Sequence, residues 1–239
     1  MNPYQRTLAG IYGDILVLDV SEGRNLYDYY LTSFIVVDGE GSSRNIAHTV
    51  SEQQDEHTFC WMFRQMNKHL STLKFTAVFP DRGSGIDAAI REAWPNIFHG
   101  LCLWHVQKNI TENLSGLLNV NYVHFKNEFW EVYRMGSPDS FEIAWQRLLN
   151  NWPEAVPYLM DNLYPDKEKW AWAWVGTRFL AGIKTTSRVE AEHKNFKLIG
   201  LGRGTNFNEL FDLLMDRSQE QKHQDFLKRY RVRQVLRLC

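Results

Sequence analysis

The sequence has few cysteines, little net charge and no long hydrophobic run. Its three cysteines are too few for a disulfide framework, which agrees with a reducing compartment. Apolar runs such as residues 15–18 and 34–37 are far shorter than the roughly 20 residues that cross a bilayer. Residues 1–13 also lack the basic and then apolar order of a signal peptide. We therefore expect a soluble, intracellular protein with no membrane partner.

A net charge of −1 argues against nonspecific electrostatic binding of nucleic acid by the chain as a whole. The charge is uneven, however, because residues 188–239 hold 11 Lys and Arg against 7 Asp and Glu. Basic residues concentrate at the end of this segment, and this stretch predicts either a solvated helix face or a surface that contacts DNA. They are Lys228, Arg229, Arg231, Arg233 and Arg237.

The chain is long enough for one large domain, or for a core with one inserted subdomain. Its first part has β-rich runs at 14–19, 30–38 and 45–50, a helical pattern at 57–71, and further β-rich runs at 75–79 and 97–102, the last two separated by a short helix. This order of three strands, helix, strand, helix and strand predicts an α/β fold: a mixed sheet with flanking helices.

Helical spacing dominates from about residue 103 to residue 181. Six of the nine tryptophans lie between Trp130 and Trp174, and we interpret them as the core of a helical subdomain, although a platform for stacked bases is the alternative. The predicted organisation is a core of residues 1–102 and 182–239 with an all-helical insertion at 103–181. Asn206 and Glu209 have the spacing of a capping box that begins a final helix.

Three acidic residues stand where predicted elements end or begin. Asp19 closes the first strand, Asp81 follows the fourth, and Glu190 lies in the helix after the insertion. If the first and fourth strands are neighbours, Asp19 and Asp81 converge on one edge of the fold. Such a carboxylate cluster suits Mg²⁺ or Mn²⁺, and two such ions can cleave a phosphodiester. Spacing alone is a weak signal, because 28 acidic residues offer many triples.

The segments around these residues are Leu16-Val17-Leu18-Asp19 with Asn25, Pro80-Asp81-Arg82, Cys102-Leu103-Trp104-His105 with Lys108-Asn109, and Thr185-Thr186-Ser187-Arg188-Val189-Glu190. Together they resemble the Mutator-like element (MULE) transposase family. The resemblance implies a ribonuclease-H-like fold with an all-helical insertion before the last acidic residue. It also implies a metal-dependent nuclease and strand transferase, with Asp19, Asp81 and Glu190 as ligands of Mg²⁺ or Mn²⁺ in a two-metal site. DNA partners (transposon ends and target), self-association into a homo-oligomer and a nuclear location follow from the same resemblance.

The sequence departs from the family pattern beside two of the acidic residues. Ser21-Glu22 stands where the family usually has Thr-Tyr, and Pro80 where it usually has Thr. Neither change removes a carboxylate, but a shifted ligand weakens a metal site. Glu192 is the weaker alternative to Glu190, because a residue two positions further along a helix points away.

The pair Cys102 and His105 has a separate interpretation, because a thiolate and an imidazole at this spacing can hold half of a zinc site. His193, three residues after Glu190, is a candidate for the other half. The alternatives are a buried cysteine beside a hydrogen-bonded histidine, and a Cys-His nucleophilic pair.

Neither end of the sequence shows a Cys/His cluster, whereas members of the family usually carry zinc-containing DNA-binding modules around this core. We therefore expect a fragment, a degenerate copy or a partial gene product. The alternative to a catalytic core is a transposase-derived, non-catalytic protein that binds DNA or regulates transcription, as in the plant far-red-impaired-response factors that resemble this family. A folded but inert relic is the third interpretation.

Overall fold

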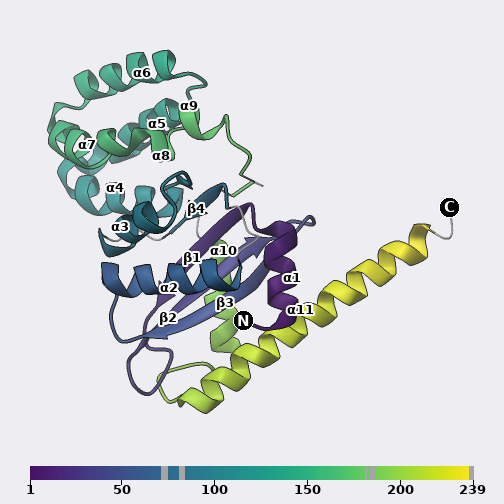
Figure 1. The fold of residues 1–239 in the computed structure, drawn as a ribbon. Helices are drawn as coiled ribbons and strands as arrows, with labels where there is room; N and C mark the ends of the chain where they lie inside the picture. Colours follow the sequence, from purple (N-terminus) through teal and green to yellow (C-terminus); the bar gives the residue numbers. More distant parts are fainter. Residues whose placement is uncertain (71–74, 81–83, 181, 184–186, 237–239) are drawn as a thin grey trace. The chain divides into compact units, whose positions relative to one another are not determined.

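The computed structural model describes residues 1–70, 75–80, 84–180, 182–183 and 187–236 (Figure 1). Packing divides the chain into two compact units. The first consists of Met1–Thr76, Gly83–Asn96 and Ser187–Cys239, and the second of Ala77–Arg82 and Ile97–Thr186. The second unit thus includes two short strands besides the helices, and the domain boundaries expected at residues 102 and 182 stay a prediction.

The first unit holds three strands and five helices among its described residues. They are α1 (Pro3–Tyr12), β1 (Ile15–Ser21), β2 (Tyr30–Val37), β3 (Ser43–Ser51), α2 (Glu56–His69), α3 (Ser84–Ala93), α10 (Ser187–Leu198) and α11 (Phe207–Leu236). The helix α1 was not predicted, although Asn2 and Gln5 form a capping box at its start.

The second unit contains two strands and the predicted run of helices. They are β4 (Ala77–Phe79), β5 (Phe98–His99), α4 (Leu103–Leu118), α5 (Tyr122–Tyr133), α6 (Pro138–Asn151), α7 (Val156–Asn162), α8 (Lys167–Trp170) and α9 (Trp172–Val175), with single 3₁₀ turns at Asn119–Asn121, Pro153–Ala155 and Tyr164–Asp166. Trp145 and Trp170 are almost fully buried in one cluster with Phe125, Phe129 and Phe141. Trp130, Trp152 and Trp174 pack against this cluster and are partly buried, whereas Trp172 is 36% exposed. The interpretation as core residues is therefore confirmed for Trp145 and Trp170.

The strands form one five-stranded sheet in the order β3-β2-β1-β4-β5. The pairs β1/β2 and β2/β3 are antiparallel, and β4/β5 is parallel. The predicted neighbours, the first and fourth strands, are adjacent. The strand β5 is shorter than the predicted run because Leu101 leaves the ladder, and its amide donates to the carbonyl of Lys169 at 3.0 Å.

The β2/β3 ladder contains one irregularity. Phe34 lies opposite Ala47, but Ile35 lies opposite Asn45, so Ile46 has no partner on β2. This is a β-bulge, which adds one residue to a strand and resets the alternation of its side chains. Ile46 is fully buried. The bulge places Asn45 on the same face of the sheet as His48.

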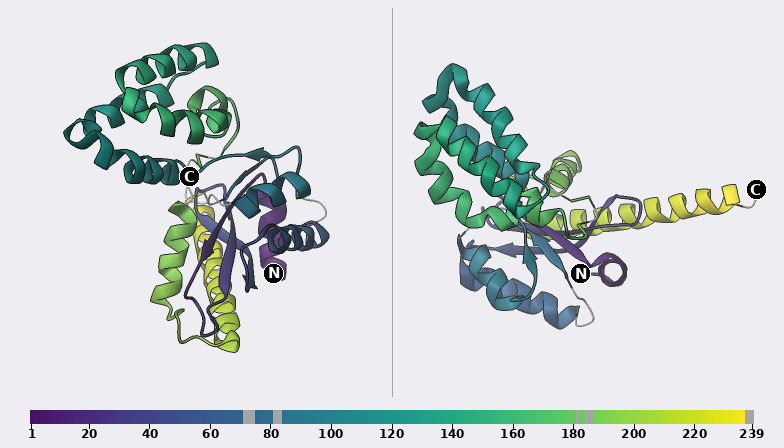
Figure 2. Two further views of the ribbon diagram at one scale, coloured as in Figure 1. Left: turned by 90° about the vertical axis from the view of Figure 1, so that its left-hand side faces the viewer. Right: turned by 90° about the horizontal axis from the view of Figure 1, so that it is seen from above.

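Helices cover the two faces of β1–β3 separately. Figure 1 shows α2 in front of these strands and α10 behind them, and the left view of Figure 2 shows the two helices on opposite sides. On the α2 face, the rings of Phe34 and Phe63 meet edge to face with centroids 6.4 Å apart. On the α10 face, Leu31, Phe196 and Leu210 share one buried cluster. This layering and strand order are those of a ribonuclease-H-like fold.

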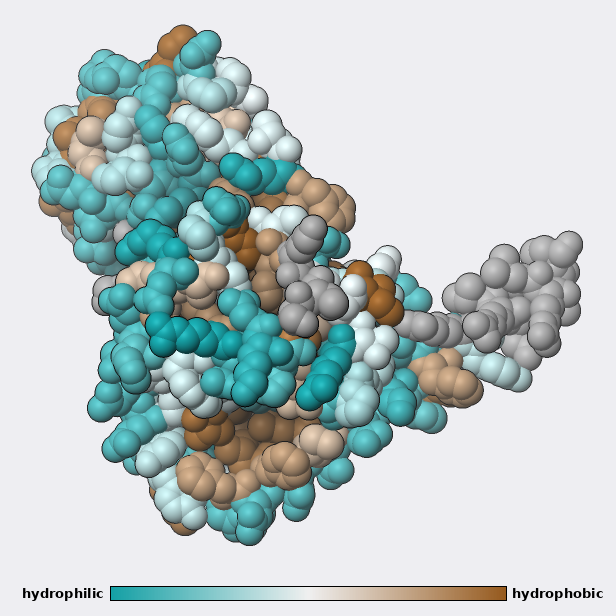
Figure 3. Space-filling model, viewed as in Figure 1, coloured by the Kyte–Doolittle hydropathy of each residue, from teal (hydrophilic) through white to brown (hydrophobic). Residues whose placement is uncertain are grey.

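The helix α11 begins with the predicted capping box. The amide of Asn206 donates to Glu209 Oε2 at 3.0 Å, and the amide of Glu209 donates to Asn206 Oδ1 at 3.1 Å. Hydrophobic side chains gather beside its first turns (Figure 3) and line an apolar hollow of about 370 Å³. No helix within the described residues is long and apolar enough to cross a membrane.

Candidate metal site

Asp19 lies inside β1, two residues before the strand ends at Ser21, and not at its end as predicted. Its side chain is buried, with 7% of the residue exposed. Oδ1 accepts a hydrogen bond from the amide of Val20 at 2.9 Å, which fixes the orientation of the carboxylate. The strand pattern alone would put an apolar residue here, so a buried carboxylate marks a position with a specific role.

Asp19 is the first member of a polar row that crosses three strands. It lies opposite Ser33 on β2, which lies opposite His48 on β3. Residues that face each other across a ladder point to the same side of the sheet, so all three lie beneath α10. The Ser33 hydroxyl and His48 Nδ1 are 3.1 Å apart. Burial lowers the pKa of His48 to about 4, so this imidazole is neutral at neutral pH.

His193 of α10 brings an imidazole to Asp19. Its Nδ1 lies 3.4 Å from Asp19 Oδ2, and the residue is 6% exposed. Glu190 lies one turn earlier in the same helix, and positions three apart share a helix face. The spacing therefore predicts that a ligand at position 190 lies on the side of α10 that carries His193. The Glu190 side chain lies outside the described part of the structure, as does Asp81.

The alternative carboxylate, Glu192, is buried and already paired. Arg217 of α11 donates to both of its oxygens, at 2.6 and 2.8 Å, and Asn45 donates at 2.6 Å. Burial alone would raise the pKa of Glu192, but the hydrogen bonds from Arg217, Asn195 and Asn45 outweigh it and lower the pKa. This carboxylate ties α10 to β3 and α11, and its oxygens are not open to a metal.

Asn25, one of the residues that carry the resemblance, shapes the loop that follows β1. It is fully buried. Its Oδ1 accepts from the amides of Tyr27 and Tyr29, each at 3.1 Å, and its Nδ2 donates to the carbonyl of Tyr29 at 2.7 Å. The amide side chain thus closes the turn after Asp19 and gives this asparagine a structural role. Ser21, at a departure from the family pattern, accepts a hydrogen bond from Arg24 within the same loop.

The pair Cys102 and His105 belongs to the second unit. Cys102 is buried and precedes α4 at its N-cap, and His105 lies in the first turn with its ring 4.7 Å from that of Trp104. Because His193 belongs to the first unit, a zinc site that joins it to this pair stays a prediction. The buried-cysteine interpretation agrees with the position of Cys102.

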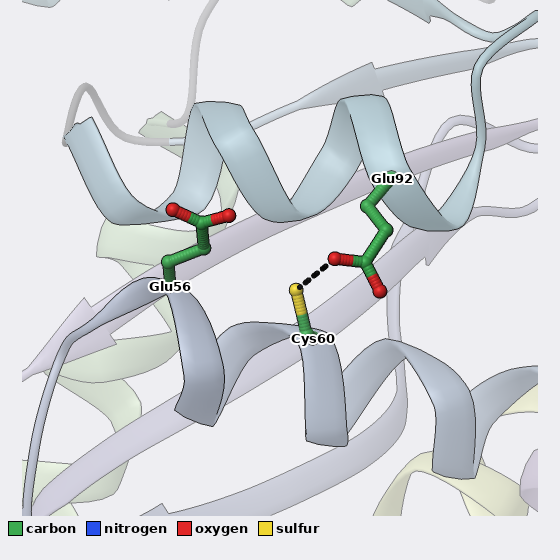
Figure 4. A group of neighbouring side chains, drawn as sticks. All are labelled: Glu56, Cys60 and Glu92. Atoms are coloured by element: carbon green, nitrogen blue, oxygen red, sulfur yellow. Dashed lines mark hydrogen bonds between the residues drawn. The ribbon is translucent and has the colours of Figure 1, made fainter.

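One other group of possible metal ligands occurs among the described residues: Glu56, Cys60 and Glu92, whose ligand atoms lie within 4.8 Å of one another. Figure 4 shows Cys60 on α2 with its sulfur directed at Glu92 of α3. The thiol donates to Glu92 Oε2 at 3.3 Å, and burial raises its pKa. Arg64 donates to the other oxygen of Glu92 at 2.6 Å. A protonated thiol beside a carboxylate that Arg64 neutralises is a hydrogen-bonded link between two helices.

Asp19 and its surroundings fit a divalent cation better. A buried carboxylate needs a compensating charge. The described side chain at its Oδ2 is the imidazole of His193, and His193 Nε2 is buried without a hydrogen-bond partner among the described residues. Oxygen and imidazole donors are those that Mn²⁺ accepts, and oxygen donors those that Mg²⁺ accepts.

Comparison with known protein families finds a match in the first half of the chain. Residues 15–109 match the MULE transposase domain. This part of the chain is thus similar to the MULE transposase family. The matched span contains Asp19, Asp81, Cys102 and His105, and it ends before Glu190.

Among curated proteins, two relatives from Arabidopsis thaliana illustrate the similarity. Protein FAR1-RELATED SEQUENCE 11 is 22% identical over 181 residues, which are 76% of this chain and 27% of the relative. Protein FAR-RED IMPAIRED RESPONSE 1 is 21% identical over 186 residues, 77% of this chain and 22% of the relative. The MULE-related chain thus spans about a quarter of the length of these relatives.

Among solved structures, the HTLV-2 integrase catalytic core domain in complex with magnesium is 16% identical to this MULE-related chain. The match covers 56% of this chain and 83% of that chain, with a TM-score of 0.27. The strand order and the helices on both faces of the sheet are what identify the ribonuclease-H-like fold.

The basic stretch at the end of α11 is only partly described. Lys228 donates to the Ser42 hydroxyl at 2.8 Å and lies 3.4 Å from Glu40 Oε2. This lysine, without an acidic neighbour in the sequence, has one in space. The other basic side chains of the stretch lie outside the described residues.

Proposed function

We propose that this chain is the catalytic core of a Mutator-like DNA transposase, which cleaves phosphodiester bonds and joins strands at transposon ends with the help of divalent metal ions. The observation that supports this most is Asp19: a buried carboxylate in β1 that faces α10 at the level of His193, one turn from the position of Glu190. Burying a charged carboxylate costs free energy, and a nearby positive charge offsets that cost.

In this proposal Asp19, Asp81 and Glu190 hold two Mg²⁺ or Mn²⁺ ions. Bound, such ions activate a water molecule or a 3′-hydroxyl and stabilise the leaving oxygen. The remaining residues position the ligands. The Val20 amide orients Asp19, while the pair of Glu192 and Arg217 fixes α10, the helix that carries Glu190.

The same proposal names transposon ends and target DNA as partners, a homo-oligomer as the working assembly, and the nucleus as the location. The chain spans about a quarter of the length of its curated relatives, so these partners and this location are proposed and not observed. The net charge of −1 agrees with a core that depends on other modules for most of its DNA affinity.

The alternative is a transposase-derived protein that binds DNA or regulates transcription without catalysis. It is favoured by the curated relatives, several of which are named FAR1-RELATED SEQUENCE proteins. This alternative keeps the fold but does not need a metal. Metal binding therefore separates the two functions.

The experiment is a calorimetric titration of Mg²⁺ and of Mn²⁺ into the purified chain, with nicking of a supercoiled plasmid followed in the same samples. We expect binding and nicking in the wild type, and the loss of both in Asp19→Asn and Asp81→Asn. Asp161→Asn is the matched control, because Asp161 is exposed on α7. A wild type that binds neither ion, or an Asp19→Asn variant that binds and nicks normally, would refute the catalytic function. Salt-dependent DNA binding without metal binding would support the alternative.

A further inference from the structure

The side chain of His193 is buried, but its two ring nitrogens have only one polar contact among the described residues. A neutral imidazole has one N–H donor and one lone-pair acceptor. Nε2 is buried without a hydrogen-bond partner among the described residues, and Nδ1 makes one contact of 3.4 Å with Asp19 Oδ2. That separation is long for a hydrogen bond, which is usually about 2.9 Å between nitrogen and oxygen. Buried polar groups with so little pairing call for another partner.

The separation of the two atoms agrees with two ligands of one ion. Metal bonds from imidazole nitrogen and from carboxylate oxygen are each about 2.1 Å long. At angles between the octahedral and tetrahedral values, such bonds put the two ligand atoms about 3.0–3.4 Å apart. His193 Nδ1 and Asp19 Oδ2, 3.4 Å apart, lie at the upper end of this range.

Neighbouring groups are engaged elsewhere and do not compete for this role. His48 lies under the same helix, but its Nδ1 is paired with the Ser33 hydroxyl. Both oxygens of Glu192 accept hydrogen bonds from Arg217. His193 is the described side chain on this face whose nitrogen lies directly beside Asp19 Oδ2.

We propose that His193 is a metal ligand, bound through Nδ1 to the same ion as Asp19. The inference rests on the proposed function and deepens it, because it changes the chemistry of the site. A site of carboxylates alone suits Mg²⁺, whereas imidazole suits transition metals and binds Mg²⁺ poorly. The ion beside Asp19 is therefore Mn²⁺ in preference to Mg²⁺. Coordination through Nδ1 leaves the proton of the neutral imidazole on Nε2.

The test uses Mn²⁺ as a paramagnetic probe in the full chain, free of any affinity tag and in a buffer without imidazole groups. Electron spin echo spectroscopy detects an imidazole nitrogen bound to Mn²⁺ directly and requires no catalytic activity. We expect nitrogen modulation in the wild type and in His69→Gln, a control at an exposed histidine. We expect the modulation to vanish in His193→Asn while Mn²⁺ still binds, about tenfold or more weakly.

The choice of asparagine separates a ligand from a positioning residue. Its amide can still donate a hydrogen bond to Asp19, so a residue that merely orients the carboxylate would be replaced without loss of affinity. Nitrogen modulation that persists in His193→Asn, or Mn²⁺ bound to the wild type in an Asp19-dependent way without modulation, would overturn the assignment of His193 and leave the proposed function standing. A wild type that binds no Mn²⁺ would overturn both.

Discussion

The two sides of the chain's interior are built from different chemistry. Beneath α10, the first unit buries a carboxylate, an imidazole and an ion pair, at Asp19, His193 and Glu192 with Arg217. The core of the second unit is a cluster of aromatic and aliphatic side chains around Trp170. Apolar burial stabilises a fold directly, whereas buried polar groups need specific partners and stabilise it little. The polar groups beneath α10 therefore contribute little to stability and agree with a binding site. The apolar core of the second unit contributes mainly to the stability of that unit.

The largest effect is expected from a change in the aromatic core. Trp170 is 1% exposed, its ring packs on Phe129 with centroids 5.3 Å apart, and its Nε1 donates to the carbonyl of Leu163. Trp170→Ala should lower the free energy of unfolding by about 4 kcal/mol, measured by denaturant titration. Trp172→Ala, at a residue that is 36% exposed, should cost under about 1 kcal/mol. Equal losses in the two variants would contradict the apolar account of this core.

The buried ion pair should respond differently, because the cost comes from a charge left without its partner. Arg217→Met leaves Glu192 buried and unpaired, and we expect a loss of about 3 kcal/mol in the free energy of unfolding. Adding Glu192→Gln to the same chain should recover most of it. Arg147→Met, which removes an exposed pair with Glu131, should change little. A double variant as unstable as the single one would show that packing, and not charge, causes the loss.

The smallest effect is a pH dependence that the aromatic core should not share. The pKa of His48 is lowered by burial from its ordinary value of 6.5 to about 4. The folded state therefore binds fewer protons than the unfolded state between these values. The contribution is complete above pH 6.5 and is lost as the pH falls toward 4. Between pH 7 and pH 5 the loss should be about 2 kcal/mol.

Unfolding curves at these two pH values for the wild type and for His48→Gln measure this effect. The variant should lose less stability on acidification than the wild type. The same pH dependence in both proteins would mean that another group, and not His48, is responsible.

Local signals in the sequence predicted much of this fold. The three β-rich runs, the amphipathic helix that became α2, and the capping box of Asn206 and Glu209 each depend on residues close together in the chain. Of the strand order, one adjacency was considered from the sequence, that of the first and fourth strands, and these strands are neighbours in the sheet. Asp19 was selected as a candidate ligand from the sequence, and it is buried in β1.

The partners of these residues were harder to predict, because they come from distant segments. The pair of Asn45 and Glu192 joins residues 147 positions apart. A strict alternation of faces, counted back from His48, puts Asn45 on the α2 side, and only the bulge at Ile46 turns it to α10. The contact of His193 with Asp19 had a signal, its spacing of three from Glu190, but the sequence left open which residue it meets.

The bulge at Ile46 determines how a chain that lacks this residue would pair. Ile46 has no partner on β2, so the loss of its codon would join Asn45 to Ala47 and restore a regular ladder. Asn45 would stay opposite Ile35, on the face that meets Glu192, at the expense of one buried side chain. We therefore expect a chain without Ile46 to keep the hydrogen bond from Asn45 to Glu192 beneath α10.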